Sequence, residues 1–307
     1  MIVVKPAPGE FYLGHYARAW CINNQGSRMT PAMARVPHGR LSHFINAFLP
    51  YPIEDFASSL GLQAETYWRS HTLLPLYFFT RLSSEGAVAD WAVSKKKLGE
   101  GFGFTRAEVV RYCPACVDGQ KKTLGFAYWR REHFIPGADL CFEHELALLV
   151  VKQEYRATAF ADAPGRGHDL VEDETPDLEE VRDCPAVQRY LARAGDVLRA
   201  IAGAGTPPLS LPQRKKTERK QSDLNGDLLP VEAIERLRRS VPDQWLRRHF
   251  PALSDASLFQ RGKLCMSDLP GTALLLLEAC DAMPASHRPT VARQSLDARA
   301  DDGTLAA

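Results

Sequence analysis

The sequence has no apolar run long enough to cross a membrane. Its longest apolar runs, such as TALLLL at 272–277, are far shorter than the roughly 20 residues that a membrane-spanning helix needs. The opening MIVVKPAPGE lacks the basic segment and the apolar stretch of a secretory signal. We therefore expect a cytoplasmic protein with reduced thiols and no membrane partner.

An excess of charge of one sign is also missing. Lysine and arginine number 38 and aspartate and glutamate 37, which gives a formal net charge of +1. Proteins that coat DNA through charge alone need a strong basic excess, because they must neutralise many phosphates. That class of protein is excluded, although local basic clusters can still contact phosphates.

The common catalytic motifs are absent as well. The sequence contains no G-x-x-x-x-G-K-[ST] phosphate loop, no H-E-x-x-H and no G-x-S-x-G. The glycine-rich segment 99–104 lacks the last glycine of a dinucleotide-binding loop, and no H-x-E precedes the C-P-x-C segment as it does in zinc deaminases. We therefore predict a protein that is not an enzyme.

The sequence does have two closely spaced pairs of metal-binding residue types, Cys113 with Cys116 and Cys141 with His144. Zn²⁺ prefers four ligands in a tetrahedron, and two residues separated by two others can reach one ion from a tight turn. These four residues are predicted to form a closed structural zinc site with no position for a reactive water. His133 is an alternative fourth ligand. Unrelated buried cysteines are the other interpretation, but paired spacing in a reducing compartment favours a metal.

The overall pattern predicts a mainly α fold with a small zinc-bound α+β module. The predicted parts are a helix-turn-helix-like N-terminal helical domain at 1–100, a central zinc knuckle at 101–155, a C-terminal helical domain at 156–283 and a disordered tail at 284–307. The clearest single helix is 184–203, whose apolar residues recur at helical spacing.

Inside the zinc module the local signals are weaker. Asp118-Gly119 indicates a turn, the aromatic segment 124–134 indicates one or two short strands, and 143–150 reads as the start of a short helix.

Residues 53–72 are a helix-turn-helix candidate. Ala57 lies four positions before Gly61, and apolar residues bracket the turn. The second helix is predicted to begin near Gln63 and to offer Gln63 and Arg69 as contacts for DNA or for a partner. The alternative is a pair of packed helices in an ordinary helical domain, since the second helix carries a single arginine.

Four basic clusters lie outside this candidate, at 95–97, at 121–122 with 130–131, at 214–220 and at 236–250. Each is able to contact phosphates or to form a solvated face. We prefer Lys121, Lys122, Arg130 and Arg131 as nucleic-acid or partner contacts, because the zinc site would hold them on a rigid module.

Three motifs occur together in the cysteine region: Cys113-Pro-Ala-Cys116, then Tyr128-Trp-Arg-Arg-Glu-His133, then Cys141-Phe-Glu-His144-Glu-Leu146. Near the start, Pro6-Ala-Pro8-Gly9-Glu10 is followed by Arg18. These motifs resemble those of the TniQ/TnsD family of transposon target-selection proteins over about the first 150 residues.

The resemblance implies a non-enzymatic adaptor that selects or marks the insertion site and recruits a TnsC-type AAA+ regulator, which brings the transposase. It also implies a bacterial protein, with Zn²⁺ on the four clustered residues. Two modes remain open. The chain either docks as a homodimer on an RNA-guided CRISPR complex of the Cascade type, or it reads target DNA directly as TnsD-like members do. The near-neutral charge favours the CRISPR-docking mode, because the guide RNA then supplies the specificity. A zinc-containing transcriptional regulator is the alternative outside transposition.

Overall fold

The structure is a computed structural model that describes residues 2–24, 53–78, 110–151, 163–165, 170–171, 178–204, 209–210, 229–254, 269, 271–283 and 290–291. The predictions for 95–97, 99–104, 214–220 and the tail beyond 291 lie outside these residues. Within them no helix is both long and apolar enough to cross a membrane.

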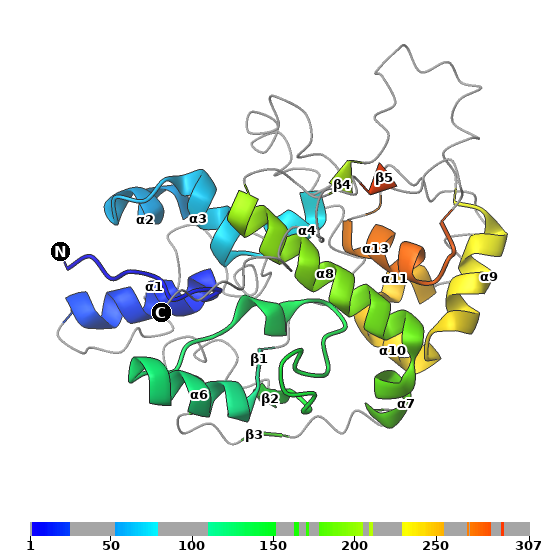
Figure 1. Ribbon diagram of the computed structural model, residues 1–307, viewed down its shortest axis with the longest axis horizontal. Helices are drawn as coiled ribbons and strands as arrows, with labels where there is room; N and C mark the ends of the chain where they lie inside the picture. The colour runs from blue at the N-terminus through cyan, green and yellow to red at the C-terminus, as the bar shows by residue number, and fades with distance from the viewer. Residues whose placement is uncertain are drawn as a thin grey trace, which may run out of the picture.

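The described residues are mostly helical, as predicted (Figure 1). The helices are α1 (Tyr12–Asn23), α2 (Ile53–Ser59), α3 (Ala64–His71), α4 (Leu74–Phe78), α6 (Pro114–Leu124), the 3₁₀ helix η3 (Arg131–Phe134), α7 (Leu178–Asp183), α8 (Pro185–Ala204), α9 (Val231–Ser240), α10 (Asp243–His249), α11 (Pro251–Ser254) and α13 (Gly271–Ala279). The strands β1 (Arg111–Tyr112), β2 (Leu149–Val151) and β3 (Leu170–Val171) form an antiparallel sheet in that order, and β4 (Leu209–Ser210) pairs with β5 (Thr290–Val291).

Helix α8 organises the molecule. It crosses the middle of Figure 1, where it packs against α3, α4 and α13. Its apolar positions are fully or almost fully buried: Val187, Leu191, Val197, Leu198 and Ile201. This confirms the predicted amphipathic helix and gives α8 a core-facing stripe of the usual kind.

One continuous core joins the three predicted parts of the chain. The rings of Phe11 and Phe134 stack with centroids 4.4 Å apart. The Tyr190 hydroxyl donates to the Pro136 carbonyl at 2.9 Å, and the Trp245 indole donates to the Gly137 carbonyl at 3.2 Å. The segment that follows the first cysteine pair is therefore packed between the N-terminal helices and the C-terminal ones.

Three local predictions were wrong. Asp118 and Gly119 lie inside α6 and form no turn; Pro114 starts this helix, and Gly125 ends it in the left-handed conformation at φ 78°. Segment 124–134 forms no strand; it contains η3 and a single bridge between Arg130 and Glu10.

The third error concerns segment 143–150, which starts no helix and instead leads into β2. Leu149 and Val150 pair with Tyr112 and Arg111 of β1. Val150 and Val151 are both buried, which suits β-branched residues in a short inner strand.

Candidate metal centre

The first cysteine pair sits at the start of α6. Cys113 is the N-cap residue of the helix, and Cys116 lies in its first turn. Residues three positions apart share one side of a helix, so both sulfurs point the same way. Both side chains are buried.

The second pair is presented by a tight turn between η3 and β2. The Cys141 amide donates to the Leu146 carbonyl at 2.8 Å, and the Glu145 amide donates to the Cys141 carbonyl at 2.9 Å. Glu145 takes a left-handed conformation with φ 53°, which lets the chain reverse within these few residues. Cys141 is thereby buried beside α6, while the His144 ring lies at the surface.

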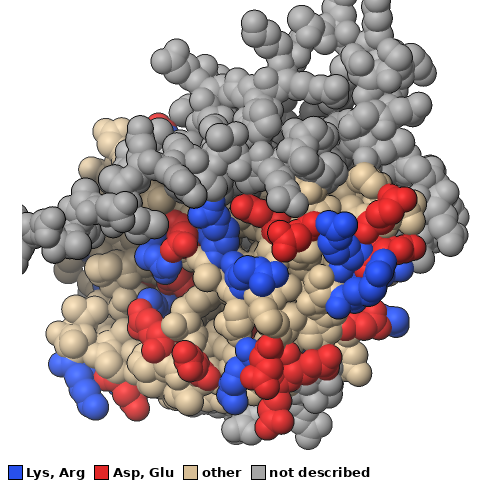
Figure 2. Space-filling model, turned by 45° about the vertical axis from the view of Figure 1, so that its right-hand side comes forward, with Lys and Arg blue, Asp and Glu red and all other residues tan. Residues whose placement is uncertain are grey.

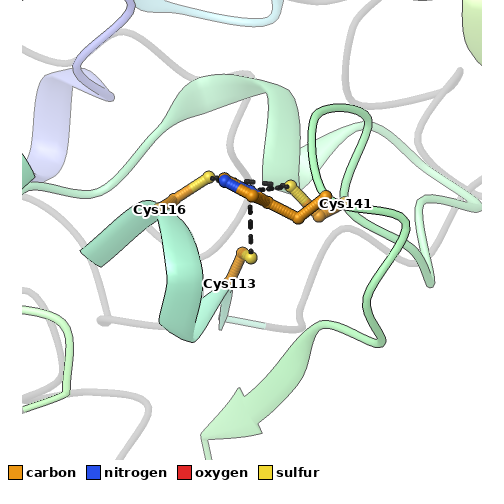
Figure 3. Close-up of side chains that lie close together, drawn as sticks. Cys113, Cys116 and Cys141 are labelled. Atoms are coloured by element: carbon orange, nitrogen blue, oxygen red, sulfur yellow. Dashed lines mark hydrogen bonds between the residues drawn. The ribbon is translucent and has the colours of Figure 1, made fainter. Parts of the chain in front are cut away.

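The four side chains converge on one point (Figure 3). His144 Nδ1 lies 3.6 Å from Cys113 Sγ, 3.4 Å from Cys116 Sγ and 3.5 Å from Cys141 Sγ. The sulfurs of Cys116 and Cys141 are 3.6 Å apart, and all four ligand atoms lie within 4.8 Å of one another. A tetrahedral ion with one nitrogen and three sulfur ligands needs N···S separations of about 3.5 Å and S···S separations of about 3.8 Å. The cluster can therefore hold a metal ion with little movement.

Contacts within the cluster also change the pKa values of its thiols. A hydrogen bond from Cys116, supported by others from His133 and His144, lowers the pKa of the Cys141 thiol. The contact with Cys141 raises the pKa of Cys116 well above its usual range, and burial raises that of Cys113. A bound cation would favour the thiolate form of all three.

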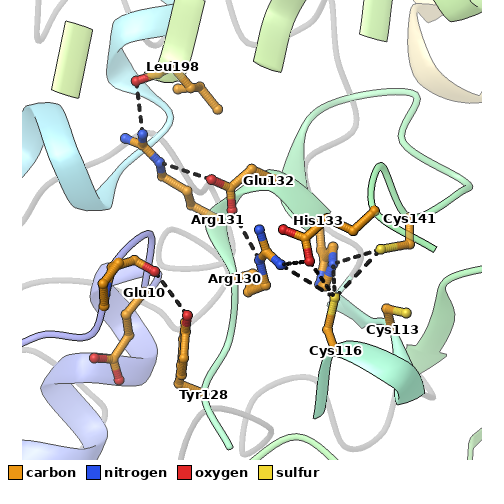
Figure 4. A network of polar contacts seen from close by, with 12 residues as sticks. Glu10, Cys113, Cys116, Tyr128, Arg130, Arg131, Glu132, His133, Cys141 and Leu198 are labelled. Carbon is orange, nitrogen blue, oxygen red and sulfur yellow. Dashed lines mark hydrogen bonds and ion pairs between the residues drawn. The ribbon is translucent and has the colours of Figure 1, made fainter. Parts of the chain in front are cut away.

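His133 is not the fourth member of the cluster. Its Nε2 lies 3.8 Å from the sulfurs of both Cys116 and Cys141, whereas His144 reaches all three sulfurs at shorter distances. The ring is buried, and its Nε2 faces the sulfurs of both cysteines (Figure 4). His144 is therefore the better fourth ligand, and His133 lies in the next layer.

Arg130 and Arg131, which are both predicted as contacts, have different surroundings. Arg131 is only 3% exposed, and its guanidinium donates to the Arg69 carbonyl at 2.7 Å and to the Leu198 carbonyl at 2.9 Å. It ties α3 to α8 and is not available as a surface contact, which corrects its assignment. Arg130 is partly exposed but turns toward the cluster, where it pairs with Glu143 at 2.5 Å.

The remaining predicted contact residues lie at the surface or near it. Lys121 and Lys122 are exposed in the last turn of α6. Gln63 is exposed as the N-cap residue of α3. Arg69 is partly buried, and its guanidinium pairs with Glu65 one turn earlier.

The helix-turn-helix candidate has the predicted outline. The α2–α3 turn contains Gly61 at φ 69°, and α3 begins directly after Gln63. However, α3 packs against both α2 and α8, and its Tyr67 and His71 side chains are buried. The other six residues of α3 are exposed or partly exposed.

Sequence reasoning missed several residues that shape this site. Glu143 lies between the ligands Cys141 and His144, and Glu132 lies within 3.6–3.8 Å of Arg130 and Arg131. For Glu143, the available signal in the sequence was its position inside the C-x-x-H motif. Asp139, which binds His249 at 3.0 Å, gave no signal, because 110 positions separate the two residues.

The comparison with known families agrees with this geometry. The TniQ family model matches residues 1–148, a range that contains α1 to α4 and all four residues of the cluster. No curated protein and no solved structure matches the chain. Residues 1–148 therefore form a TniQ domain.

Proposed function

We propose that this chain is a non-enzymatic adaptor that selects the target site in DNA transposition. The observation that carries the proposal is the TniQ match over residues 1–148, which includes the clustered cysteines and histidine. In this role the metal-held segment is a rigid platform for macromolecular partners. It supplies no reactive group, because all four protein ligands close the coordination shell.

We propose Zn²⁺ as the ion held by Cys113, Cys116, Cys141 and His144. Three sulfurs and one imidazole nitrogen in a tetrahedron are a typical structural zinc set, and the N···S distances of 3.4–3.6 Å agree with it. Elemental analysis of the purified protein should give one zinc per chain. A full-length protein without bound metal would reject this assignment.

Within the family role, we propose that the chain connects an RNA-guided CRISPR complex of the Cascade type to a AAA+ regulator of the TnsC type, and through it to the transposase. Reliance on a guide RNA is supported by features that suit direct DNA reading poorly. The net charge is +1, α3 packs against α8, and Arg69 is paired with Glu65. A direct reader would need many free cationic contacts to phosphates.

The charge pattern of one face supports the same choice. Basic and acidic side chains alternate over the face seen in Figure 2. Exposed arginines pair with acids about one turn away: Arg199 with Asp196, Arg239 with Glu235 and Arg247 with Asp243. Such pairs break up any single-sign stripe on the described parts of α8, α9 and α10 that a nucleic-acid backbone could follow.

We place the partner contacts on the exposed end of α6, at Lys121 and Lys122, and at Gln63 at the start of α3. We further propose that the protein is a homodimer in the bacterial cytoplasm. Light scattering on the purified chain measures the dimer directly.

The test is co-purification with candidate partners. The tagged chain should retain a guide-RNA complex and a AAA+ regulator encoded beside it. Lys121→Glu/Lys122→Glu should weaken retention of one of these partners about tenfold, while the exposed control Arg199→Gln should not.

A gel-shift series over many DNA sequences and several salt concentrations tests the direct mode. One strongly preferred sequence would replace the guide-dependent proposal with the TnsD-like one, and a preferred palindrome without any transposition partner would favour a transcriptional regulator.

A further inference from the structure

The charge of the proposed zinc centre is not balanced by its ligands. Three thiolates, one divalent ion and a neutral imidazole sum to −1 (+2 − 3 = −1), and the three cysteines are all buried. A buried unbalanced charge is costly unless neighbouring groups donate hydrogen bonds to it or bring an opposite charge. The side chains in the layer around the ligands must therefore supply this compensation.

Two side chains approach the sulfur of Cys116 from that layer. Arg130 Nη1 lies 3.5 Å from Cys116 Sγ, and His133 Nε2 lies 3.8 Å from the same sulfur. His133 Nε2 is also 3.8 Å from Cys141 Sγ. These are distances of N–H···S hydrogen bonds, so Cys116 faces one cation and one imidazole N–H (Figure 4).

The tautomer of His133 follows from its surroundings. Its ring is 3% exposed, and Nε2 faces two sulfurs that are thiolates when metal is bound. Nε2 must then carry the proton, because a lone pair there would repel both sulfurs. Within the described residues Nδ1 has no hydrogen-bond partner, so the ring is committed to the cluster through Nε2 alone.

Arg130 is held in place by two carboxylates. Its Nη1 pairs with Glu143 at 2.5 Å, and its Nε lies 3.6 Å from Glu132. Glu143 also lies 3.8 Å from the Cys116 sulfur. The positive charge of Arg130 lies beside both groups and reduces the repulsion between the carboxylate and the thiolate. Glu132 in turn lies 3.8 Å from Arg131, which binds the Leu198 carbonyl of α8.

We propose that Arg130 and His133 are outer-sphere positioning residues of the metal centre, which donate hydrogen bonds to the Cys116 thiolate and so retain the ion. The inference rests on the proposed binding of zinc to the four clustered residues. Neither residue is a ligand. Their function is to hold the sulfur of Cys116, which has the most side-chain donors around it, in place on the ion.

The primary test is the rate at which a chromophoric chelator removes zinc from the folded, zinc-loaded full chain. Loss of outer-sphere partners commonly weakens metal binding 10–100-fold. We expect His133→Leu and Arg130→Leu each to release zinc at least about tenfold faster than the wild type. His133→Gln keeps an N–H at a similar reach and should restore most of the retention. Arg239→Leu, at an exposed arginine of α9, is the matched control and should release zinc at the wild-type rate.

A spectroscopic measurement separates this role from a general loosening of the fold. With Co²⁺ in place of zinc, removal of an N–H···S bond raises the energy of the sulfur lone pair, so the sulfur-to-cobalt charge-transfer band should move to longer wavelength in His133→Leu. The band should stay near its wild-type position in His133→Gln. Circular dichroism with excess zinc checks that each variant is folded.

Glu143→Gln provides a test that does not disturb the core, because the Glu143 side chain is 53% exposed. It weakens the hold on Arg130 and should accelerate zinc release in the same direction but less. If His133→Leu does not fold, Arg130→Leu and Glu143→Gln decide the question.

The possible failures are distinct. A wild-type protein that binds no metal would overturn the zinc assignment and this inference together. A wild-type protein that holds zinc, with release rates and cobalt bands unchanged in the leucine variants, would overturn only the role of Arg130 and His133.

Discussion

Two regions of the molecule are buried to a similar degree but differ in secondary structure. One is the segment 110–151, which contains the four clustered residues, and the other consists of helices α8, α10 and α13. Between Gly125 and Leu148, all of which the structure describes, the chain contains one short 3₁₀ helix and single-residue bridges. Helices α8 and α13, in contrast, bury apolar side chains along their length. We expect the first region to depend on its proposed ion and on specific polar contacts as well as on apolar burial, whereas the second depends on hydrophobic burial alone.

The two regions meet at the loop 136–139. The Gly137 carbonyl accepts from Trp245 of α10, and Asp139 accepts from His249 of the same helix. Asp139 also lies 3.6 Å from Arg111 of β1. Besides the shared apolar core, these buried polar contacts thus connect the region around the cluster to the helical region. Each of the following experiments acts on one region, on this junction or on the N-terminal helices beside them.

The largest effect should come from removing the metal ligands. Cys113→Ser/Cys141→Ser deletes two of the three sulfurs, so we expect loss of bound metal and a decrease of more than about 4 kcal/mol in the free energy of unfolding. Hydrogen exchange should show lost protection across 110–151 while α8 and α13 stay protected. Cys184→Ser, a partly buried cysteine outside the cluster, is the control. Equal protection of 110–151 in the double variant would contradict the metal dependence of this region.

The junction itself is tested at Gly137. This residue has φ 81°, and an added Cβ would lie 2.3 Å from Cζ2 of Trp245. We expect Gly137→Ala to lower the free energy of unfolding by about 4 kcal/mol, because it combines backbone strain with a displaced, fully buried tryptophan. The matched control is Gly119→Ala inside α6, where no atom lies within 4 Å of the added Cβ. That control should be neutral or slightly stabilising in urea titrations.

Sequence reasoning found one main feature of each region, and it did so for different physical reasons. The cluster of Cys113, Cys116, Cys141 and His144 was predictable because ligand spacing is local and the chemistry of zinc restricts it. Helix α8 was predictable because hydrophobic periodicity over 20 residues is a strong signal.

The errors arose where distant residues decide the local structure. Segment 143–150 leads into a strand because β1 offers an edge for Leu149 and Val150, which no local pattern reveals. Arg131 looks like a surface cation in sequence, yet the carbonyls of Arg69 and Leu198, 62 and 67 positions away, bury it. The same applies to Asp139 and His249.

The helical region should respond to the loss of apolar volume alone. Leu276 of α13 is fully buried in the core that α13 shares with α8. We expect Leu276→Ala to lower the free energy of unfolding by about 3 kcal/mol with zinc affinity unchanged. Leu124→Ala, at an exposed leucine on α6, should change stability little. A large change in zinc affinity in Leu276→Ala would show that the two regions are more strongly coupled than the comparison implies.

The smallest effect concerns pH and lies in the N-terminal helices that pack on both regions. Burial lowers the pKa of His71 to about 4, against the effect of the hydrogen bond that Nδ1 donates to the Glu10 carbonyl. In the unfolded chain the imidazole pKa is about 6.5, so the unfolded state binds the proton more tightly. The free energy of unfolding should therefore fall as the pH drops below about 6.5 and level off below about 4.

His71→Asn tests this assignment, because asparagine keeps a donor for the Glu10 carbonyl but does not titrate. Between pH 7 and pH 5 the wild type should lose about 2 kcal/mol more stability than the variant. The difference between the two proteins at each pH removes the contribution of metal loss, which both share. Parallel pH curves would mean that the pKa of His71 is the same in the folded and unfolded chains, so that this residue contributes nothing to the pH dependence of stability. A wild type that gains stability relative to the variant as the pH falls would mean that the folded protein binds the proton more tightly, and that acid strengthens these helices where we expect weakening.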